Sequence, residues 1–191
     1  MNPYDLFITD LLRSCPNELV LDNGTGNGRF ALRLASLGCE VVALDINLRL
    51  LRAAKDKTRK ENVHVVLADM THLPFASESF AKVICVHNLW CVPDYTKAVQ
   101  EMRRTAHSDG IIVADHLNLL DPRNFADPAF YFVAVKTATG TGLYIWRTAS
   151  AVLAPFQGAS TDVYSVFKYE PLCIVKRARR FARRFVIRCT T

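Results

Sequence analysis

Short apolar runs alternate with amphipathic stretches through the first 115 residues of the chain. The apolar runs are short and rich in β-branched residues, so they predict β-strands; they cover residues 18–22, 40–45, 63–67, 82–86 and 111–114. Apolar positions three and four residues apart predict helices; these cover residues 2–13, 29–37, 47–60 and 93–106. Apolar strands connected by helices predict an α/β fold, with a Rossmann-like, doubly wound and mostly parallel sheet covered on both faces.

The pattern is weaker after residue 116. Residues 129–156 are expected to hold two short helices, separated by the Gly- and Thr-rich residues 139–142. Two further runs, residues 163–169 and 172–175, predict strands that pair with each other around Pro171.

Positive charge is concentrated at the C-terminal end of the chain. The formal net charge is +6, from 24 Lys and Arg against 18 Asp and Glu, and seven of the basic residues but no acid follow Glu170. Apolar residues from Ala178 to Phe185 fall on one side of a helix, which predicts a basic amphipathic tail over residues 176–191 after a single domain over residues 1–175. Such a tail suits an anionic partner, either RNA or a membrane surface, or it is a solvated face whose Phe residues dock on the domain.

The composition is that of an ordinary globular protein, with 50% hydrophobic and 22% charged residues among 191. No apolar run approaches the length of a membrane span, and residues 1–10 lack the basic and apolar regions of a signal peptide, so a cytoplasmic location is expected. The six cysteines include no C-x-x-C pair and no Cys/His cluster. They are expected to be reduced thiols, with no metal bound.

A glycine-rich turn between the first strand and the second helix is the strongest chemical feature of the sequence. It reads Asp22-Asn23-Gly24-Thr25-Gly26-Asn27-Gly28. Glycines permit a tight turn and the close approach of a ligand, and the N–H groups of the following helix point at that ligand. The G-x-G-x-G spacing differs from the G-x-G-x-x-G of nicotinamide-dinucleotide sites, and no G-K-[ST] follows as in a P-loop.

Acidic residues end the second and third predicted strands. Asp45 lies twenty-one residues after Gly24, where a carboxylate can accept both hydroxyls of a ribose. Asp69 is placed either to accept a hydrogen bond from the amino group of a purine or to cap a turn. Because the carboxyl ends of parallel strands meet at one edge of a sheet, Asp22, Asp45 and Asp69 are expected to line one crevice.

These motifs together resemble the class I S-adenosylmethionine-dependent methyltransferases, in the small-molecule branch that includes the quinone-biosynthesis C-methyltransferases. The first motif of that family, an acid followed by G-x-G-x-G, matches residues 22–28. Its ribose-binding acid matches Asp45, and its adenine-side acid with the next residue matches Asp69 and Met70. An LPF loop and a fourth-strand motif follow, and the similarity covers about residues 18–115.

The resemblance implies a seven-stranded sheet with an antiparallel last strand, and S-adenosylmethionine as cofactor with S-adenosylhomocysteine as product. The residues that it places at the cofactor are Asp22, Asn23, Gly24, Thr25, Gly26, Asn27, Gly28, Asp45, Ile46, Asp69, Met70, His87 and Asn88.

The acceptor of the methyl group is less well defined by the sequence. His87 ends the fourth strand beside the expected methyl position, as a candidate general base or as a wall residue. Aromatic residues are frequent over residues 125–146, which indicates either an aromatic-lined pocket or ordinary core packing. We expect a small, apolar or aromatic acceptor. An RNA methyltransferase anchored by its basic tail and a non-catalytic cofactor-binding protein are the alternatives, and the oligomeric state stays open.

Overall fold

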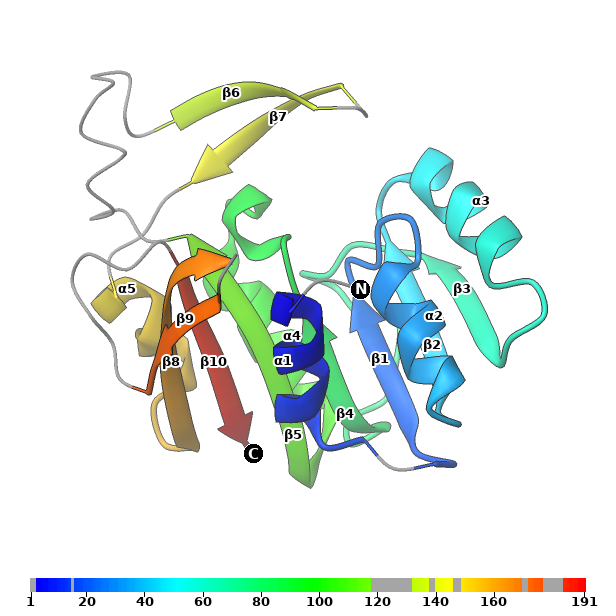
Figure 1. Cartoon of the computed structure of the whole chain (residues 1–191), viewed down its shortest axis with the longest axis horizontal. Helices are drawn as coiled ribbons and strands as arrows, with labels where there is room; N and C mark the ends of the chain where they lie inside the picture. Colours follow the sequence, from blue (N-terminus) through cyan, green and yellow to red (C-terminus); the bar gives the residue numbers. More distant parts are fainter. Residues whose placement is uncertain are drawn as a thin grey trace.

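A computed structural model of the chain describes residues 3–14, 16–117, 132–137, 140–145, 149–169, 172–176 and 184–191. Eight strands form one mixed sheet in the order β3-β2-β1-β4-β5-β10-β8-β9, with helices on both faces (Figure 1). None of the helices within these ranges has the length and apolar character needed to span a bilayer.

The N-terminal half of the sheet confirms the predicted α/β pattern. Five parallel strands are β1 (Leu19–Asn23), β2 (Glu40–Asp45), β3 (Val63–Leu67), β4 (Phe80–Cys85) and β5 (Ala106–Leu117). The helices are α1 (Pro3–Leu12), α2 (Arg29–Ser36), α3 (Leu48–Lys57), the short 3-10 helix η1 (Leu89–Cys91) and α4 (Tyr95–Thr105). Strand β5 begins five residues earlier than predicted, because Ala106 already pairs with Phe80 of β4. The register then shifts over residues 107–110, and regular pairing resumes where Lys82 faces Ile111.

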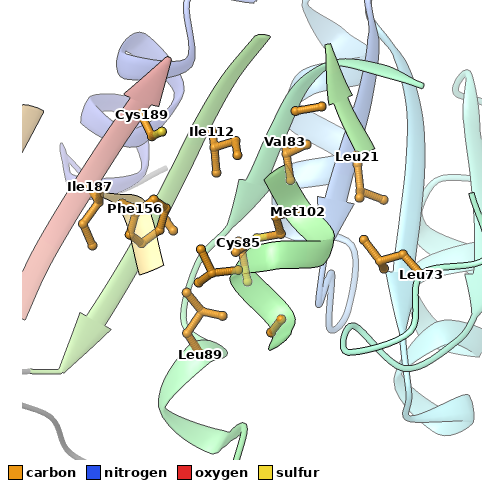
Figure 2. Packing of buried hydrophobic residues seen from close by; sticks show 14 of the residues in the cluster. Leu21, Leu73, Val83, Cys85, Leu89, Met102, Ile112, Phe156, Ile187 and Cys189 are labelled. Carbon is orange, nitrogen blue, oxygen red and sulfur yellow. The ribbon is translucent and has the colours of Figure 1, made fainter. Parts of the chain in front are cut away.

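Two hydrophobic clusters cover the two faces of the sheet. Successive residues of a strand point to opposite faces, so neighbours along β1, β4 and β5 enter different clusters. One cluster joins the sheet to α4 and to the 3-10 helix η3 (Ala154–Phe156), and it includes Leu21, Val83, Met102, Ile112, Phe156 and Ile187 (Figure 2). The other joins the sheet to α1 and α2, and it includes Tyr4, Ile8, Val20, Leu34, Ile84 and Val113.

The C-terminal strands complete the sheet. Strand β10 (Arg184–Thr190) runs antiparallel to both of its neighbours, β5 and β8 (Ser160–Tyr169), and β9 (Leu172–Val175) pairs with β8 at the edge. Seven strands therefore have the expected arrangement with an antiparallel last strand, and β9 adds an eighth. The pairing of β8 with β9 confirms the prediction for residues 163–175.

The prediction of a separate basic tail over residues 176–191 is wrong for its last part. Residues 184–190 form strand β10 inside the sheet, with Val186, Ile187 and Cys189 fully buried. The physical reason is that residues 185–187 combine an aromatic with two β-branched residues, and such an apolar run suits a buried strand better than the end of a helix. Residues 177–183, which carry most of the predicted helical stripe, lie outside the described residues.

The two helices expected over residues 129–156 are only partly present. A hairpin of β6 (Phe132–Thr137) and β7 (Gly140–Ile145) takes the place of the first, and the helix α5 (Ala149–Leu153) follows it. Val, Thr and aromatic residues favour strands, and residues 140–142 lie inside β7, where they pair with residues 135–137 instead of separating two helices.

The loop that follows β3 is held in place by Glu101 of α4. The carboxylate of Glu101 is buried and accepts hydrogen bonds from the backbone N–H of Leu73 at 2.8 Å and from two guanidinium nitrogens of Arg104 at 2.8 and 2.9 Å. Arg104 in turn donates to the backbone oxygens of Leu73 and Phe75. The bond from Arg104 is the main reason that the pKa of Glu101 falls to about 2; burial opposes it, and the Leu73 N–H adds to it.

Replacing Glu101 with Gln should lower the free energy of unfolding near neutral pH by about 2 kcal/mol, because hydrogen bonds to a charged group are lost. The folded pKa lies below the unfolded value of 4.5, so this stabilisation is complete above that value and is lost as the pH falls towards 2. Urea denaturation should therefore show a difference in the free energy of unfolding between the two proteins at pH 7, and a smaller difference at about pH 3. A difference of equal size at both pH values would contradict this account.

Candidate active site

The glycine-rich turn lies at the carboxyl end of β1 and leads into α2. Gly24 has φ 82°, and a Cβ there would lie 2.6 Å from the side-chain amide nitrogen of Asn88. Gly26 has φ 58°, yet no atom lies within 4 Å of the position that its Cβ would take. Gly24 is therefore required for packing, whereas Gly26 faces open space in which a ligand can approach the backbone.

Two polar side chains lie beneath this turn. Asp22 is buried and accepts a 2.6 Å hydrogen bond from the Thr25 hydroxyl. Burial raises the pKa of Asp22 to about 6, against hydrogen bonds from Thr25 and from the backbone of Ala31. Asn23 is fully buried, and neither polar atom of its side chain has a hydrogen-bond partner within the part of the chain that the structure describes. Such buried polar groups normally find a partner, so Asn23 indicates a place for a polar ligand or water.

Asp45 connects the carboxyl end of β2 to the glycine turn. One carboxylate oxygen accepts from the Gly26 N–H at 2.9 Å, and the other accepts from the Asn47 N–H at 2.8 Å. Asn47 caps α3 by accepting from the N–H groups of Arg49 and Leu50. A carboxylate oxygen has two lone pairs, so Asp45 keeps the capacity to accept hydroxyl groups while it holds the turn.

Asp69 fulfils the turn-capping role that the sequence left open. Its Oδ1 accepts from both the N–H and the hydroxyl of Thr71 at 2.8 Å. The side chain is exposed, so its carboxylate also has room to accept a hydrogen bond from a ligand.

Two cavities meet at Gly24 and Asn88. The larger cavity, of about 450 Å³, is lined by Asp45 and Asp69 together with apolar residues that include Ile46, Leu50, Met70 and Val92. The smaller cavity, of about 330 Å³, is lined by residues 24–27, Arg29, Phe30, Val86, His87 and Asn88. Asn88 lines both cavities, and its amide donates to the backbone oxygens of Gly24 at 2.5 Å and Val86 at 2.8 Å.

His87 follows β4 and is mostly buried beside the smaller cavity. It has φ 65°, and its backbone N–H donates to Oδ1 of Asp115 at 2.7 Å. Burial lowers the pKa of His87 to about 4; Asp115 opposes the shift, and the charges of Arg184 and Arg29 add to it. The imidazole is therefore neutral at physiological pH.

Ten of the thirteen residues predicted at the cofactor line one of these cavities. The exceptions are Asp22, Asn23 and Gly28. Asp22 and Asn23 are buried, and Gly28 packs against Ala54 of α3. The aromatic residues over 125–146 lie outside the part of the chain whose side chains are described.

The structure adds lining residues that the sequence did not single out. They are Leu44, Asn47, Leu50, Ala68, Thr71, Cys91, Val92 and Pro93 in the larger cavity, and Arg29, Phe30 and Val86 in the smaller one. Arg29 had a detectable signal, because it directly follows the last glycine of the turn. Nothing in the sequence of residues 91–93 indicates that they line a cavity. The 3-10 helix η1 brings them there.

The fold and the site together define a class of protein. A parallel sheet with a G-x-G-x-G turn after β1 and an acid after β2, both facing one cavity, is the arrangement of a Rossmann-like S-adenosylmethionine-dependent methyltransferase. The residues present fit that cofactor, because Gly26 opens onto free space, Asp45 can accept hydroxyl groups and Asn23 lacks a partner for its polar atoms within the described chain.

Comparison with known proteins agrees with this class. The family described as "Methyltransferase domain" matches residues 21–114, and the chain belongs to that family. An uncharacterised protein of Methanocaldococcus jannaschii, MJ0638, is 30% identical over 178 residues, which are 89% of this chain and 72% of that protein. The demethylmenaquinone methyltransferase of Renibacterium salmoninarum is 34% identical over 106 residues, which are 56% of this chain.

Solved structures show the same fold at lower identity. The Thermotoga maritima protein TM1293, described as an S-adenosylmethionine-dependent methyltransferase and possible histamine N-methyltransferase, superposes with a TM-score of 0.73 at 19% identity. The superposition covers 97% of this chain and 87% of that one. The chain spans less than half the length of the Renibacterium salmoninarum enzyme, since the match covers 44% of that protein.

Proposed function

We propose that the chain transfers the methyl group of S-adenosylmethionine to a small, apolar or aromatic acceptor. The junction of the two cavities is the observation that carries the proposal. The larger cavity offers Asp45 and Asp69 for the hydroxyl and amino groups of adenosine among apolar walls, and the smaller one offers the glycine turn for the methionine end.

The cofactor supplies a sulfonium-bound methyl group that is already electrophilic. The chain's own residues then have to hold the two reactants in line, which is catalysis by proximity. Asp45 couples ribose recognition to the turn, because its carboxylate accepts from the Gly26 N–H. The bonds of Asn88 to Gly24 and Val86 hold its side chain where the two cavities meet.

The class of acceptor rests on the relatives. Several curated relatives are demethylmenaquinone methyltransferases, whose name states a quinone-type substrate. The RNA alternative relied on the basic tail. Within that tail, Arg184 is buried in the sheet and Arg188 donates to the backbone oxygen of Leu11 at 3.1 Å, so neither is arranged as a phosphate anchor.

The test measures S-adenosylhomocysteine formed from S-adenosylmethionine, with hydroxyarenes, quinols and total RNA as separate acceptors. We expect product with an aromatic acceptor, and at least a tenfold loss of turnover in an Asp45→Ala variant at low cofactor concentration. Product formed only with RNA would favour the alternative partner. Cofactor binding without product on any acceptor would favour a non-catalytic binding protein.

A further inference from the structure

Four polar side chains from distant parts of the chain form a buried network behind the smaller cavity. Asp115 at the end of β5 and Arg184 at the start of β10 are 0% and 6% exposed and form an ion pair. Asp115 also accepts from the Tyr4 hydroxyl at 2.6 Å and from the His87 backbone N–H at 2.7 Å. Burial alone would raise the pKa of Asp115; Arg184 and the neighbouring donors instead hold the pKa below its ordinary value.

Arg184 contacts the imidazole of His87 directly. Its Nη1 lies 2.9 Å from Nδ1 of His87, and its guanidinium carbon lies 4.9 Å from the centre of the Trp90 ring. A guanidinium group donates hydrogen bonds and cannot accept them, so Nδ1 must accept through its lone pair. In a neutral imidazole the ring proton is then on Nε2.

The groups around His87 favour the neutral imidazole. The rings of Tyr4 and Trp90 meet the imidazole edge to face, with ring centres 5.6 and 5.7 Å away. Charged groups face it from three elements: Asp115 from β5, Arg184 from β10 and Arg29 from α2. The carboxylate and the guanidinium of the ion pair balance each other, which leaves the imidazole no net attraction for a second proton.

We propose that Arg184 is a positioning residue, which fixes His87 as a neutral imidazole with its proton on Nε2. His87 then serves the smaller cavity as a hydrogen-bond donor and does not accept a proton from the methyl acceptor. Neither ring nitrogen could take that proton, because Nδ1 is engaged by Arg184 and Nε2 already carries one. This protonation state excludes the general-base role considered for His87. Only that exclusion rests on the proposed function; the state of the ring itself does not.

The state of the ring is measurable in the free protein, without cofactor or acceptor. Two-bond ¹H–¹⁵N correlation spectra of protein labelled in histidine distinguish a protonated from an unprotonated ring nitrogen, and a His87→Gln variant assigns the signal. We expect protonated Nε2 and unprotonated Nδ1, unchanged between about pH 5.5 and pH 8. A proton on Nδ1, or a titration of His87 within that range, would overturn the proposal.

An Arg184→Met variant tests the positioning role itself. Asp115 then faces His87 without its partner, so we expect the pKa of His87 to rise by about two units or more and the ring to titrate within the same range. Arg188→Met is the matched control on the same strand, since Arg188 bonds to Leu11 instead, and it should leave the His87 signals unchanged. Unchanged signals in folded Arg184→Met would also overturn the proposal. If that variant does not fold, the spectrum of the wild-type protein still decides the state of the ring. These spectra are recorded without cofactor, acceptor or turnover. The proposal on His87 and the proposed methyl transfer can therefore fail independently of each other.

Discussion

A Gly26→Ala variant is expected to fold but to lose most of its affinity for S-adenosylmethionine. The added methyl group meets no protein atom within 4 Å, so it enters the open space beside the turn instead of the core. That space is where the proposed function places the ligand, at the junction of backbone and cavity. We expect the dissociation constant, measured by calorimetric titration, to rise by about tenfold to a hundredfold, or about 1.4 to 2.7 kcal/mol.

The chain provides a matched control in Gly158. Gly158 has φ 84° and, like Gly26, no atom within 4 Å of the Cβ position. Gly158 precedes β8 and lies at the end of the sheet opposite the glycine turn. Ser160 of β8 pairs with Thr190, and Thr190 pairs with Ile111, where the regular part of β5 begins. The glycine turn lies instead at the carboxyl ends of the parallel strands. An alanine with a left-handed backbone costs about 1–2 kcal/mol, so both variants should lose similar stability. Equal cofactor affinity in the two variants would argue against a cofactor site at Gly26.

The site could be predicted from the sequence where its chemistry is local. The glycines and Asp22 are contiguous, and Asp45 and Asp69 each follow a strand whose apolar run is plain in the sequence. The parallel order of those strands then brings the acids to one edge. No long-range information was needed to predict these glycines and acids.

Arg184 shows why the rest could not be predicted. Its role depends on β10 inserting between β5 and β8. The pairing of β10 with β5 joins residues about seventy positions apart, which no local pattern encodes. In the sequence it is one of seven basic residues after Glu170, and it falls at the end of a convincing helical stripe. Residues 178, 181, 182 and 185 have helical spacing in the sequence, yet the apolar run that begins at Phe185 belongs to a strand.

The position of β10 in the sheet predicts a large effect for Ile187→Ala. Ile187 is fully buried and lies in the cluster with Ile112 and Phe156 (Figure 2). Shortening a buried isoleucine to alanine removes about 2–5 kcal/mol of stability, through lost transfer free energy and the cavity that remains. Urea denaturation should therefore show a clearly lower midpoint with an unchanged slope.

Lys176→Ala is the control from the same C-terminal segment. Its side chain is exposed and its ion pair with Asp162 lies at the surface, so the midpoint should stay at the wild-type value. If residues 176–191 formed a tail apart from the domain, both substitutions would leave the midpoint unchanged. A lower midpoint for Ile187→Ala alone would instead mean that this segment is part of the core, and that Arg184 is held by the same strand that stabilises the fold.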